Sequence, residues 1–267
     1  MARNTYGLDL GSYEIKVYDK KQDTIWKEKN VLAVQDKKEI IAIGEDAYQM
    51  YEKTPPDIEV AFPMRDGVIS RFNDMQNLLQ NILKKNRHFS RGAEYVIAVP
   101  TDVTEVQKKA FFDLVIHSNA KAREVNIVER SIADAVGLGI DVQNTTGVMI
   151  INFGGETTEL SVLTEGGIVF NRLLKLGGTT LDQEIVNLVR NSHDFLIGSR
   201  TAEILRQQFD VFNGDSETAF SVAGRDLITG LPMRKTISIT LVRAAFKDTL
   251  LECMKVQLLA SLPFSPH

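Results

Sequence analysis

Two short stretches of the sequence combine an acidic or carboxamide side chain with a turn of very small residues. Residues 6–17 read Tyr-Gly-Leu-Asp-Leu-Gly-Ser-Tyr-Glu-Ile-Lys-Val, and residues 149–160 read Met-Ile-Ile-Asn-Phe-Gly-Gly-Glu-Thr-Thr-Glu-Leu. Each is an apolar strand, a polar residue, one apolar residue, a small turn and a second strand. We interpret the two stretches as an internal repeat. The alignment places Asp9 on Asn152, Gly11 on Gly154 and Ser12 on Gly155.

The chemistry of such turns favours phosphate. Glycine and serine leave room for close approach, so the backbone N–H groups of the turn can face a ligand. A ring of such donors suits phosphate oxygens, and an acidic residue at the strand end suits Mg²⁺, which prefers oxygen ligands and water. A single copy would indicate only a β-hairpin, but duplication favours a polyphosphate held from two sides. Neither a Walker loop nor a Rossmann fingerprint occurs.

Alternating strand and helix patterns predict an α/β architecture that positions these turns. Capping boxes that begin at Thr104 and Thr180 predict helices to about Ser118 and Arg190. The pattern pauses in a polar stretch at Asp141–Thr146, where we place the domain boundary. The predicted strands are Tyr6–Leu10, Ile15–Tyr18, Val31–Val34, Glu39–Ile43, Tyr95–Val99, Val125–Val128, Val148–Phe153, Glu159–Leu163 and Ile168–Leu174, and the further helices are Asp74–Arg87, Ser131–Gly139 and Leu241–Leu259.

Composition argues against several classes of protein. The 267 residues are 43% hydrophobic and 25% charged, which is typical of a soluble globular chain. A net charge of −4 without a strongly basic block argues against nucleic acid as a partner. No apolar run reaches the roughly 18–20 residues of a transmembrane helix, and no signal peptide is predicted. The single cysteine, Cys253, fits a reducing cytoplasm, and four separated histidines argue against a zinc site.

Six segments together resemble the bacterial actin-like cell-shape proteins, the MreB family. They are residues 7–12, 100–106, 133–139, 152–159, 196–203 and 224–232. The resemblance implies the two-lobed fold of actin and the chaperone ATPases, built from ribonuclease-H-like α/β domains around an ATP cleft. It implies a first lobe over residues 1–144, with a small subdomain at about 30–72. The second lobe would span residues 145–267, with a small subdomain at about 195–240, and would be incomplete, since the family continues into a Gly-rich adenine loop and a final helix.

In the first loop, the resemblance gives Asp9 a contact with the water shell of a metal ion. It gives Gly11 and Ser12 a place in the cradle for the β-phosphate. The next two positions, Tyr13 and Glu14, depart from the smaller or uncharged residues of the family, and Glu14 suits phosphate only if it points away. Lys16 is spaced like a phosphate-contacting lysine of actin, although a surface lysine on an edge strand is an alternative.

In the second loop, the family's aspartate is replaced by Asn152 and its third glycine by Glu156. Asparagine can still accept a hydrogen bond from metal-bound water but lacks the charge. Glutamate adds a carboxylate near the terminal phosphate. Gly154 and Gly155 match the family. We therefore predict that ATP and Mg²⁺ bind, but more weakly than in the family at large.

The place that positions the attacking water also departs from the family. The family has Glu-Glu-Pro here, and this chain has Glu129-Arg130-Ser131. Arginine cannot act as a general base, because its pKa exceeds about 12. Arg130 could neutralise phosphate charge, or turn outward to pair with Glu129 or Asp134. Glu129 could serve only if the turn is remodelled, so we expect at most a weak ATPase.

On the ribose and adenine side, the resemblance assigns residues in two further segments. Gly177 and Gly178 match the family near the ribose, with Thr179 in place of an aspartate. Glu203 and Arg206 match positions that line the adenine side, and Ile204 replaces an acidic residue that is often found there. Ordinary helix-surface charge is the alternative for the two charged residues.

The resemblance implies a cytoplasmic filament that binds ATP, lies at the inner face of the cell membrane and determines rod shape with the cell-wall synthesis machinery. Its partners would be copies of itself and that machinery. A small-molecule kinase is one rival, but no segment resembles its catalytic base. A degenerate, non-hydrolysing actin-like regulator that does not polymerise alone is the stronger rival. The family attaches to membrane by an N-terminal helix or an apolar loop, and here Phe89, between Arg87 and Arg91, is the candidate.

Overall fold

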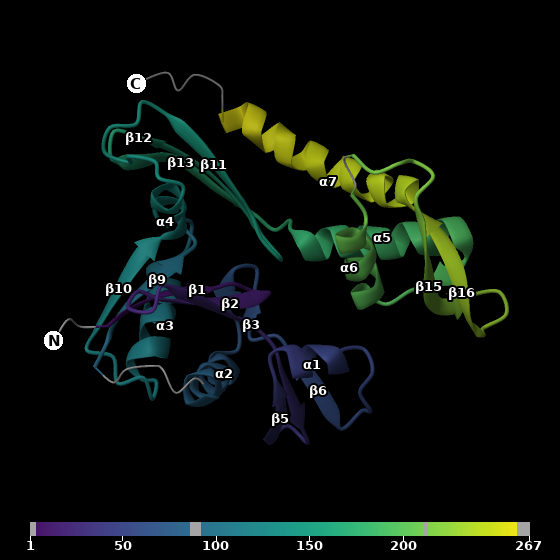
Figure 1. Ribbon diagram of the computed structural model, residues 1–267, viewed down its shortest axis with the longest axis horizontal. Coiled ribbons are helices and arrows are strands. Elements are labelled where there is room, and N and C mark those ends of the chain that lie inside the picture. Colours follow the sequence, from purple (N-terminus) through teal and green to yellow (C-terminus); the bar gives the residue numbers. More distant parts are fainter. Residues whose placement is uncertain (1–3, 86–91, 211–212, 261–267) are drawn as a thin grey trace. The chain divides into compact units, whose positions relative to one another are not determined.

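The computed structural model describes residues 4–85, 92–210 and 213–260, and the chain divides into two compact units, Met1–Lys175 and Leu176–His267 (Figure 1). Each unit has its own sheets, helices and apolar core. The predicted lobe boundary at 144/145 lies inside the first unit, and the lobe assignment stays a prediction.

A five-stranded sheet forms the centre of the first unit, in the order β10-β9-β1-β2-β3. Its outer strand β3 (Thr24–Lys29) is largely exposed and polar, and its sequence gave no strand prediction. Strand β1 pairs in parallel with β9, which pairs in parallel with β10, whereas β1, β2 and β3 are antiparallel neighbours. The other strands, all predicted, are β1 (Thr5–Leu10), β2 (Glu14–Asp19), β9 (Glu94–Val99) and β10 (Glu124–Glu129).

The helices α2 (Phe72–Lys85) and α3 (Glu105–Ile116) contribute to the core of this sheet (Figure 1). Apolar residues of β1 alternate inward and share a core with Leu78 and Phe111 of the helices. The capping box predicted at Thr104 is present, since its side chain accepts the Gln107 N–H and the Gln107 side chain accepts the Thr104 N–H. This helix therefore begins where the sequence predicts.

Two three-stranded sheets and the two-stranded pair β7-β8 complete the first unit. One has the order β5-β4-β6 and packs with α1 over a core of Val31, Ala33 and Ala47. The other has the order β11-β12-β13, and α4 packs on it through Ala135 against Ile150. The bounds are β4 (Leu32–Gln35), β5 (Glu39–Ile43), α1 (Glu45–Met50), β6 (Ile58–Ala61), β7 (Met64–Arg65), β8 (Val68–Ile69), α4 (Arg130–Gly137), β11 (Val148–Phe153), β12 (Thr158–Thr164) and β13 (Gly167–Leu174).

The second unit is a helical cluster with a three-stranded sheet in the order β14-β15-β16. Its core includes Ile185, Phe195, Leu205 and Val242. The bounds are α5 (Gly178–His193), β14 (Phe195–Leu196), α6 (Ser199–Gln208), β15 (Ala219–Asp226), β16 (Pro232–Ser238) and α7 (Ile239–Ala260).

The capping box predicted at Thr180 is wrong. Helix α5 begins two residues earlier, at Gly178, and the Thr180 Oγ1 accepts the Gly177 N–H at 3.2 Å from within the first turn. The prediction failed because glycine is unfavourable inside helices, yet here Gly177 is the N-cap residue and Gly178 the first residue of α5. Among the described residues, no helix is both long and apolar enough to cross a membrane.

Candidate functional site

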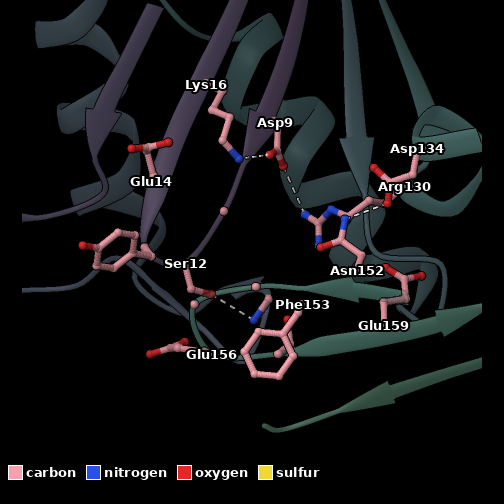
Figure 2. Close-up of a pocket in the computed structure, with 16 residues that line it drawn as sticks. Asp9, Ser12, Glu14, Lys16, Arg130, Asp134, Asn152, Phe153, Glu156 and Glu159 are labelled. Atoms are coloured by element: carbon pink, nitrogen blue, oxygen red, sulfur yellow. Dashed lines mark hydrogen bonds and ion pairs between the residues drawn. The ribbon is translucent and has the colours of Figure 1, made fainter. Parts of the chain in front are cut away.

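The two repeated turns come together around one cavity of the first unit (Figure 2). The cavity measures about 340 Å³, and its lining includes Asp9 to Glu14, except Leu10, from the first loop and residues 152–157 of the second. Lys16 of β2, Arg130 and Asp134 of α4, and Glu159 of β12 also line it. The first and second loops, defined as residues 9–14 and 152–157, therefore face a shared space, as the repeat predicts.

Both turns have the same internal geometry. The Gly11 N–H donates to the Glu14 carbonyl at 3.1 Å, and the Gly154 N–H donates to the Thr157 carbonyl at 2.8 Å. A Cβ added to either glycine would lie 2.9 Å from that same carbonyl oxygen. Glycine is thus required for the hydrogen bond that closes each turn. These two N–H groups are engaged inside the turns, so they shape the loops rather than serve a ligand.

The two loops also contact each other. A Cβ on Gly155 would lie 2.5 Å from the Tyr13 Cβ, so only glycine permits this approach. The Ser12 Oγ accepts the Gly67 N–H at 3.1 Å. Because a hydroxyl also has one hydrogen to donate, Ser12 can still donate to an anion. The small residues predicted to cradle phosphate therefore serve first to bring two loops side by side.

Asp9 lies between two cations. Its Oδ2 is 3.0 Å from the Lys16 Nζ, and its Oδ1 is 3.5 Å from an Arg130 Nη2 (Figure 2). Asp9 and Lys16 are opposite each other in the β1–β2 register, and β2 is an inner strand. The alternative of a lysine on an edge strand is therefore wrong.

Arg130 points into the cavity, so the predicted outward orientation is also wrong. Its side chain is only 11% exposed, and its ion pair is with Asp9 rather than Glu129 or Asp134. Arg130 is the first residue of α4, directly after β10, and this position aims it at the end of β1. Glu129 does not line this cavity but faces a separate hollow beside Ile140.

In the second loop, the polar residues are hydrogen-bonded within the protein. The Asn152 Nδ2 donates to Asp134 Oδ2 at 2.6 Å. Burial raises the pKa of the Asp134 carboxyl, although this hydrogen bond and the charge of Arg130 act in the opposite direction. Glu156 accepts from Arg65 Nη1 at 2.9 Å and from the Asp66 N–H at 2.7 Å. Its carboxylate is therefore neutralised at the wall of the cavity.

Glu14 belongs to the cavity lining, and its carboxylate lies apart from the group formed by Asp9 and Arg130 (Figure 2). Glu14 is two residues from Lys16 on β2, so both side chains lie on the same face of that strand, and Glu14 is not turned away from the cavity. The other predicted residues of the two loops all line the cavity. Phe89 lies outside the described residues.

Two acidic residues of the cavity were not predicted as site residues, namely Asp134 and Glu159. Glu159 is only 3% exposed; its Oε1 accepts the Thr101 N–H at 2.8 Å and the Asn171 Nδ2 at 2.9 Å. Its Oε2 has no hydrogen-bond partner in the described part of the chain. The repeat could have identified Glu159, because it is opposite Asn152 in the β11–β12 register as Lys16 is opposite Asp9.

The donors around the cavity do not fit the Mg²⁺ that the sequence predicts at Asp9 and Asn152. A divalent ion beside Asp9 would stand next to the positive side chains of Lys16 and Arg130, which repel it. The Asn152 amide is turned to donate to Asp134. Within the residues that the structure describes, no three His, Cys, Asp or Glu side chains are grouped to hold a metal ion.

The predicted ribose and adenine residues form a cluster in the second unit. Arg206 makes a bidentate contact with Asp182, with Nε–Oδ1 at 2.6 Å and Nη2–Oδ2 at 3.1 Å. A Cβ on Gly178 would lie 3.2 Å from an Arg206 nitrogen, so the glycine gives the guanidinium room. Burial raises the pKa of Asp182, against the effect of Arg206. Glu203 is buried beside this pair, Gly177 precedes α5, and Ile204 is exposed.

Comparison with known proteins gives consistent matches over nearly the whole chain. Residues 3–262 match the family described as MreB/Mbl protein. The cell shape-determining protein MreB of Escherichia coli K12 is 33% identical over 259 residues, which covers 94% of this chain and 74% of that protein. The cell shape-determining protein Mbl of Bacillus cereus is 31% identical over 246 residues, which covers 91% of this chain and 73% of that protein.

Solved structures also match this chain in fold. MreB5 of Spiroplasma citri bound to AMPPNP has a TM-score of 0.90 at 29% identity, covering 98% of this chain and 80% of that one. The same protein bound to ADP gives a TM-score of 0.89 at 30% identity, with the same coverage. A MamK double helical filament, at 20% identity and a TM-score of 0.75 over 98% of this chain and 82% of that one, supports the fold alone. The predicted actin-like fold class is confirmed.

Proposed function

This chain belongs to the MreB/Mbl protein family, and from this premise we propose that it is an actin-like cytoskeletal protein that binds ATP at the cavity between the two loops. The observation that carries the proposal is the pair of matching glycine turns, in contact at Gly155, with Lys16 and Arg130 beside them. Two positive side chains and a serine hydroxyl suit a polyphosphate. Magnesium is left out of the proposal, because the donors do not fit it.

We further propose that the chain assembles with copies of itself into filaments at the inner face of the cytoplasmic membrane. There it would determine rod shape by organising the cell-wall synthesis machinery. The names of the curated relatives as cell shape-determining proteins support this role. Phe89, which lies outside the described residues, stays the candidate for membrane contact. Flotation with anionic liposomes tests it: Phe89→Ser filaments should no longer float with the vesicles.

Sedimentation tests the filament. The full chain should pellet with ATP and stay in the supernatant without nucleotide. Lys16→Ala should reduce pelleting with ATP, because Lys16 lies in the cavity. Lys20→Ala, at the exposed turn that follows β2, should pellet like the wild type. Equal pelleting of the wild type with and without ATP would count against nucleotide-dependent assembly.

The second candidate function, a non-hydrolysing regulator that does not polymerise alone, is favoured by the inward orientation of Arg130. Arginine at this place removes the carboxylate that positions the attacking water in the family, so we predict slow or absent ATP hydrolysis. A positioned acid–base group contributes about 10²–10⁴-fold. Arg130→Glu should therefore raise phosphate release, and the double variant with Asn152→Asp should raise it further. An unchanged rate in the double variant would contradict the role assigned to position 130.

A further inference from the structure

Arg130 is held loosely by a single acidic partner. Its Nη2 lies 3.5 Å from the Asp9 Oδ1, whereas charge-assisted N–H···O⁻ contacts are usually about 2.7–2.9 Å. Among the described residues, Asp9 is the one carboxylate within ion-pair distance of Arg130. Asp9 also has the closer partner Lys16 at 3.0 Å. The guanidinium can therefore leave Asp9 without leaving that carboxylate unpaired.

Apart from Asp9 and Glu14, the carboxylates that line the cavity are hydrogen-bonded within the protein. Glu156 is paired with Arg65, and Asp134 accepts from Asn152. The Glu159 Oε1 accepts from Thr101 and Asn171. An anion that enters the cavity consequently meets two positive groups, Lys16 and Arg130, and within the described residues each of them forms its ion pair with Asp9.

Arginine is well suited to replace a metal ion in this position. Its planar guanidinium carries five N–H donors, is always charged, and binds phosphate oxygens through a bidentate contact. The side chain is 11% exposed, so its charge acts in a partly desolvated space, where it is screened less than at the surface. A divalent ion would have to enter beside that charge and would be repelled.

Resting on the proposed nucleotide site, we propose that this chain binds the polyphosphate of a nucleoside triphosphate through Arg130 and Lys16 and without a divalent cation. On binding, the guanidinium gives up the long contact with Asp9 and makes a bidentate contact with phosphate, while Asp9 stays paired with Lys16. Arg130, at the start of α4, is the residue whose substitution tests this difference from a metal-dependent site.

Equilibrium titration of the full chain with a fluorescent ATP analogue tests this, once in EDTA and once in magnesium chloride. The wild type should bind with about the same Kd in both, within roughly threefold. Arg130→Glu should lose about 10–100-fold in EDTA, since a hydrogen bond to a charged group contributes about 1.5–3 kcal/mol, and should recover when magnesium is added. Inorganic tripolyphosphate should compete in EDTA, because the phosphates carry the contact.

Arg123→Glu is the matched control. Arg123 is exposed and precedes the opposite end of β10, so the same charge change there should leave both Kd values unchanged. Circular dichroism establishes that each variant is folded. Arg130→Lys keeps the positive charge but cannot make a bidentate contact, so it should weaken nucleotide binding in EDTA less than Arg130→Glu does.

Three outcomes would overturn the inference. If the wild type binds only with magnesium, the metal-free mode fails while the nucleotide site of the proposed function stands. If it binds in neither buffer, the nucleotide site itself fails. If Arg123→Glu weakens binding as much as Arg130→Glu, the effect is one of overall charge rather than of Arg130.

Discussion

The first and second loops share the same closing backbone hydrogen bond but differ in the charge of the side chains around them. In both, a glycine N–H closes the turn onto a carbonyl three residues later, and a Cβ on Gly11 or Gly154 would lie at the same 2.9 Å from that oxygen. The side chains that flank the turns differ in charge. The first loop has Asp9 paired with a lysine, and the second has Asn152 paired with a buried acid. The backbone of the repeat is therefore fixed by sterics, while its chemistry is free to vary.

The difference extends to the position across each hairpin. Lys16 is opposite Asp9, and Glu159 is opposite Asn152. The first pair is a partly exposed ion pair, and the second consists of buried or half-buried groups that are hydrogen-bonded to the protein. Only the first hairpin, through Lys16 of β2, thus brings positive charge to the cavity, and Arg130 is added from α4. An anion should be held chiefly from the side of the first loop.

The loops are also fixed in place by different means. The first is supported by Asn30, whose Nδ2 donates to the Gly11 carbonyl at 2.8 Å and whose N–H donates to the Tyr13 carbonyl at 3.0 Å. The second is attached through Glu156 to Arg65 and Asp66. One support is neutral and buried, and the other is an ion pair. The attachment of the second loop through Glu156 should therefore respond to salt and to charge-changing substitutions, whereas the support of the first loop by Asn30 should not.

The largest effect should come from Gly155→Ala, where the two loops touch. A Cβ at this position would lie 2.5 Å from the Tyr13 Cβ, which cannot move without moving the first loop. Overpacking of this kind costs about 1–3 kcal/mol. Urea unfolding measures it, and ATP binding should weaken as well because the loops are pushed apart.

Gly137→Ala is the control for this substitution. Gly137 lies in α4 with nothing within 4 Å of an added Cβ, so alanine should leave stability equal or raise it by about 0.5–1 kcal/mol. A fully stable Gly155→Ala variant with unchanged ATP affinity would mean that the loops do not touch as described.

Asn152→Asp should have the next largest effect, and it should depend on pH. The new carboxyl would face Asp134, whose pKa burial already raises. Two carboxyls within hydrogen-bond distance share a proton, so the folded state of the variant holds a proton that the unfolded state has lost. Stability must then fall as pH rises from the ordinary carboxyl range, near 4, through the raised pKa.

Melting temperature across pH 4 to 8 checks this. The variant should lose about 1–2 kcal/mol relative to wild type near neutral pH, and the loss should shrink as the pH falls, because each pKa unit corresponds to about 1.4 kcal/mol. The same loss at every pH would show that Asp134 and position 152 are not coupled. The first loop lacks such a carboxyl pair, so Asp9→Asn should not introduce this pH dependence.

Much of the scaffold could be predicted from the sequence because its signals are local. The alternation of apolar residues gave β1, β2 and β12, a continuous apolar run gave β11, and the glycine turns gave the repeat. Strand β3 was missed because its six residues are mostly polar and exposed, so no alternation marks it. Helix α1, with six residues, is too short for a periodic pattern to be recognised.

The chemistry of the cavity was harder to predict because its partners are far apart in sequence. Arg130 and Asp9 are 121 residues apart, and only the fold decides that the guanidinium turns inward. Glu156 was expected near the phosphates, but its partner Arg65, 91 residues away, holds it at the wall. Glu159 looked like an ordinary strand residue until the register placed it opposite Asn152. Residue type predicts what a group can do, and tertiary contacts decide what it faces.

The smallest effect should come from Glu156→Gln, which tests how the second loop is attached. Glutamine can still accept the Asp66 N–H but loses the ion pair with Arg65, a side chain that is 58% exposed. An ion pair that is partly open to solvent contributes about 0.5–1 kcal/mol, and salt screens it. Urea unfolding at low and high salt should show that loss at low salt and little at high salt. Glu165→Gln, at the exposed turn between β12 and β13, makes the same change at a carboxylate that has no ion pair with the described residues, and it should have no effect at either salt. If Glu156→Gln is as stable as wild type at low salt, the second loop is held by its backbone alone, and the contrast with the neutral support of the first loop disappears.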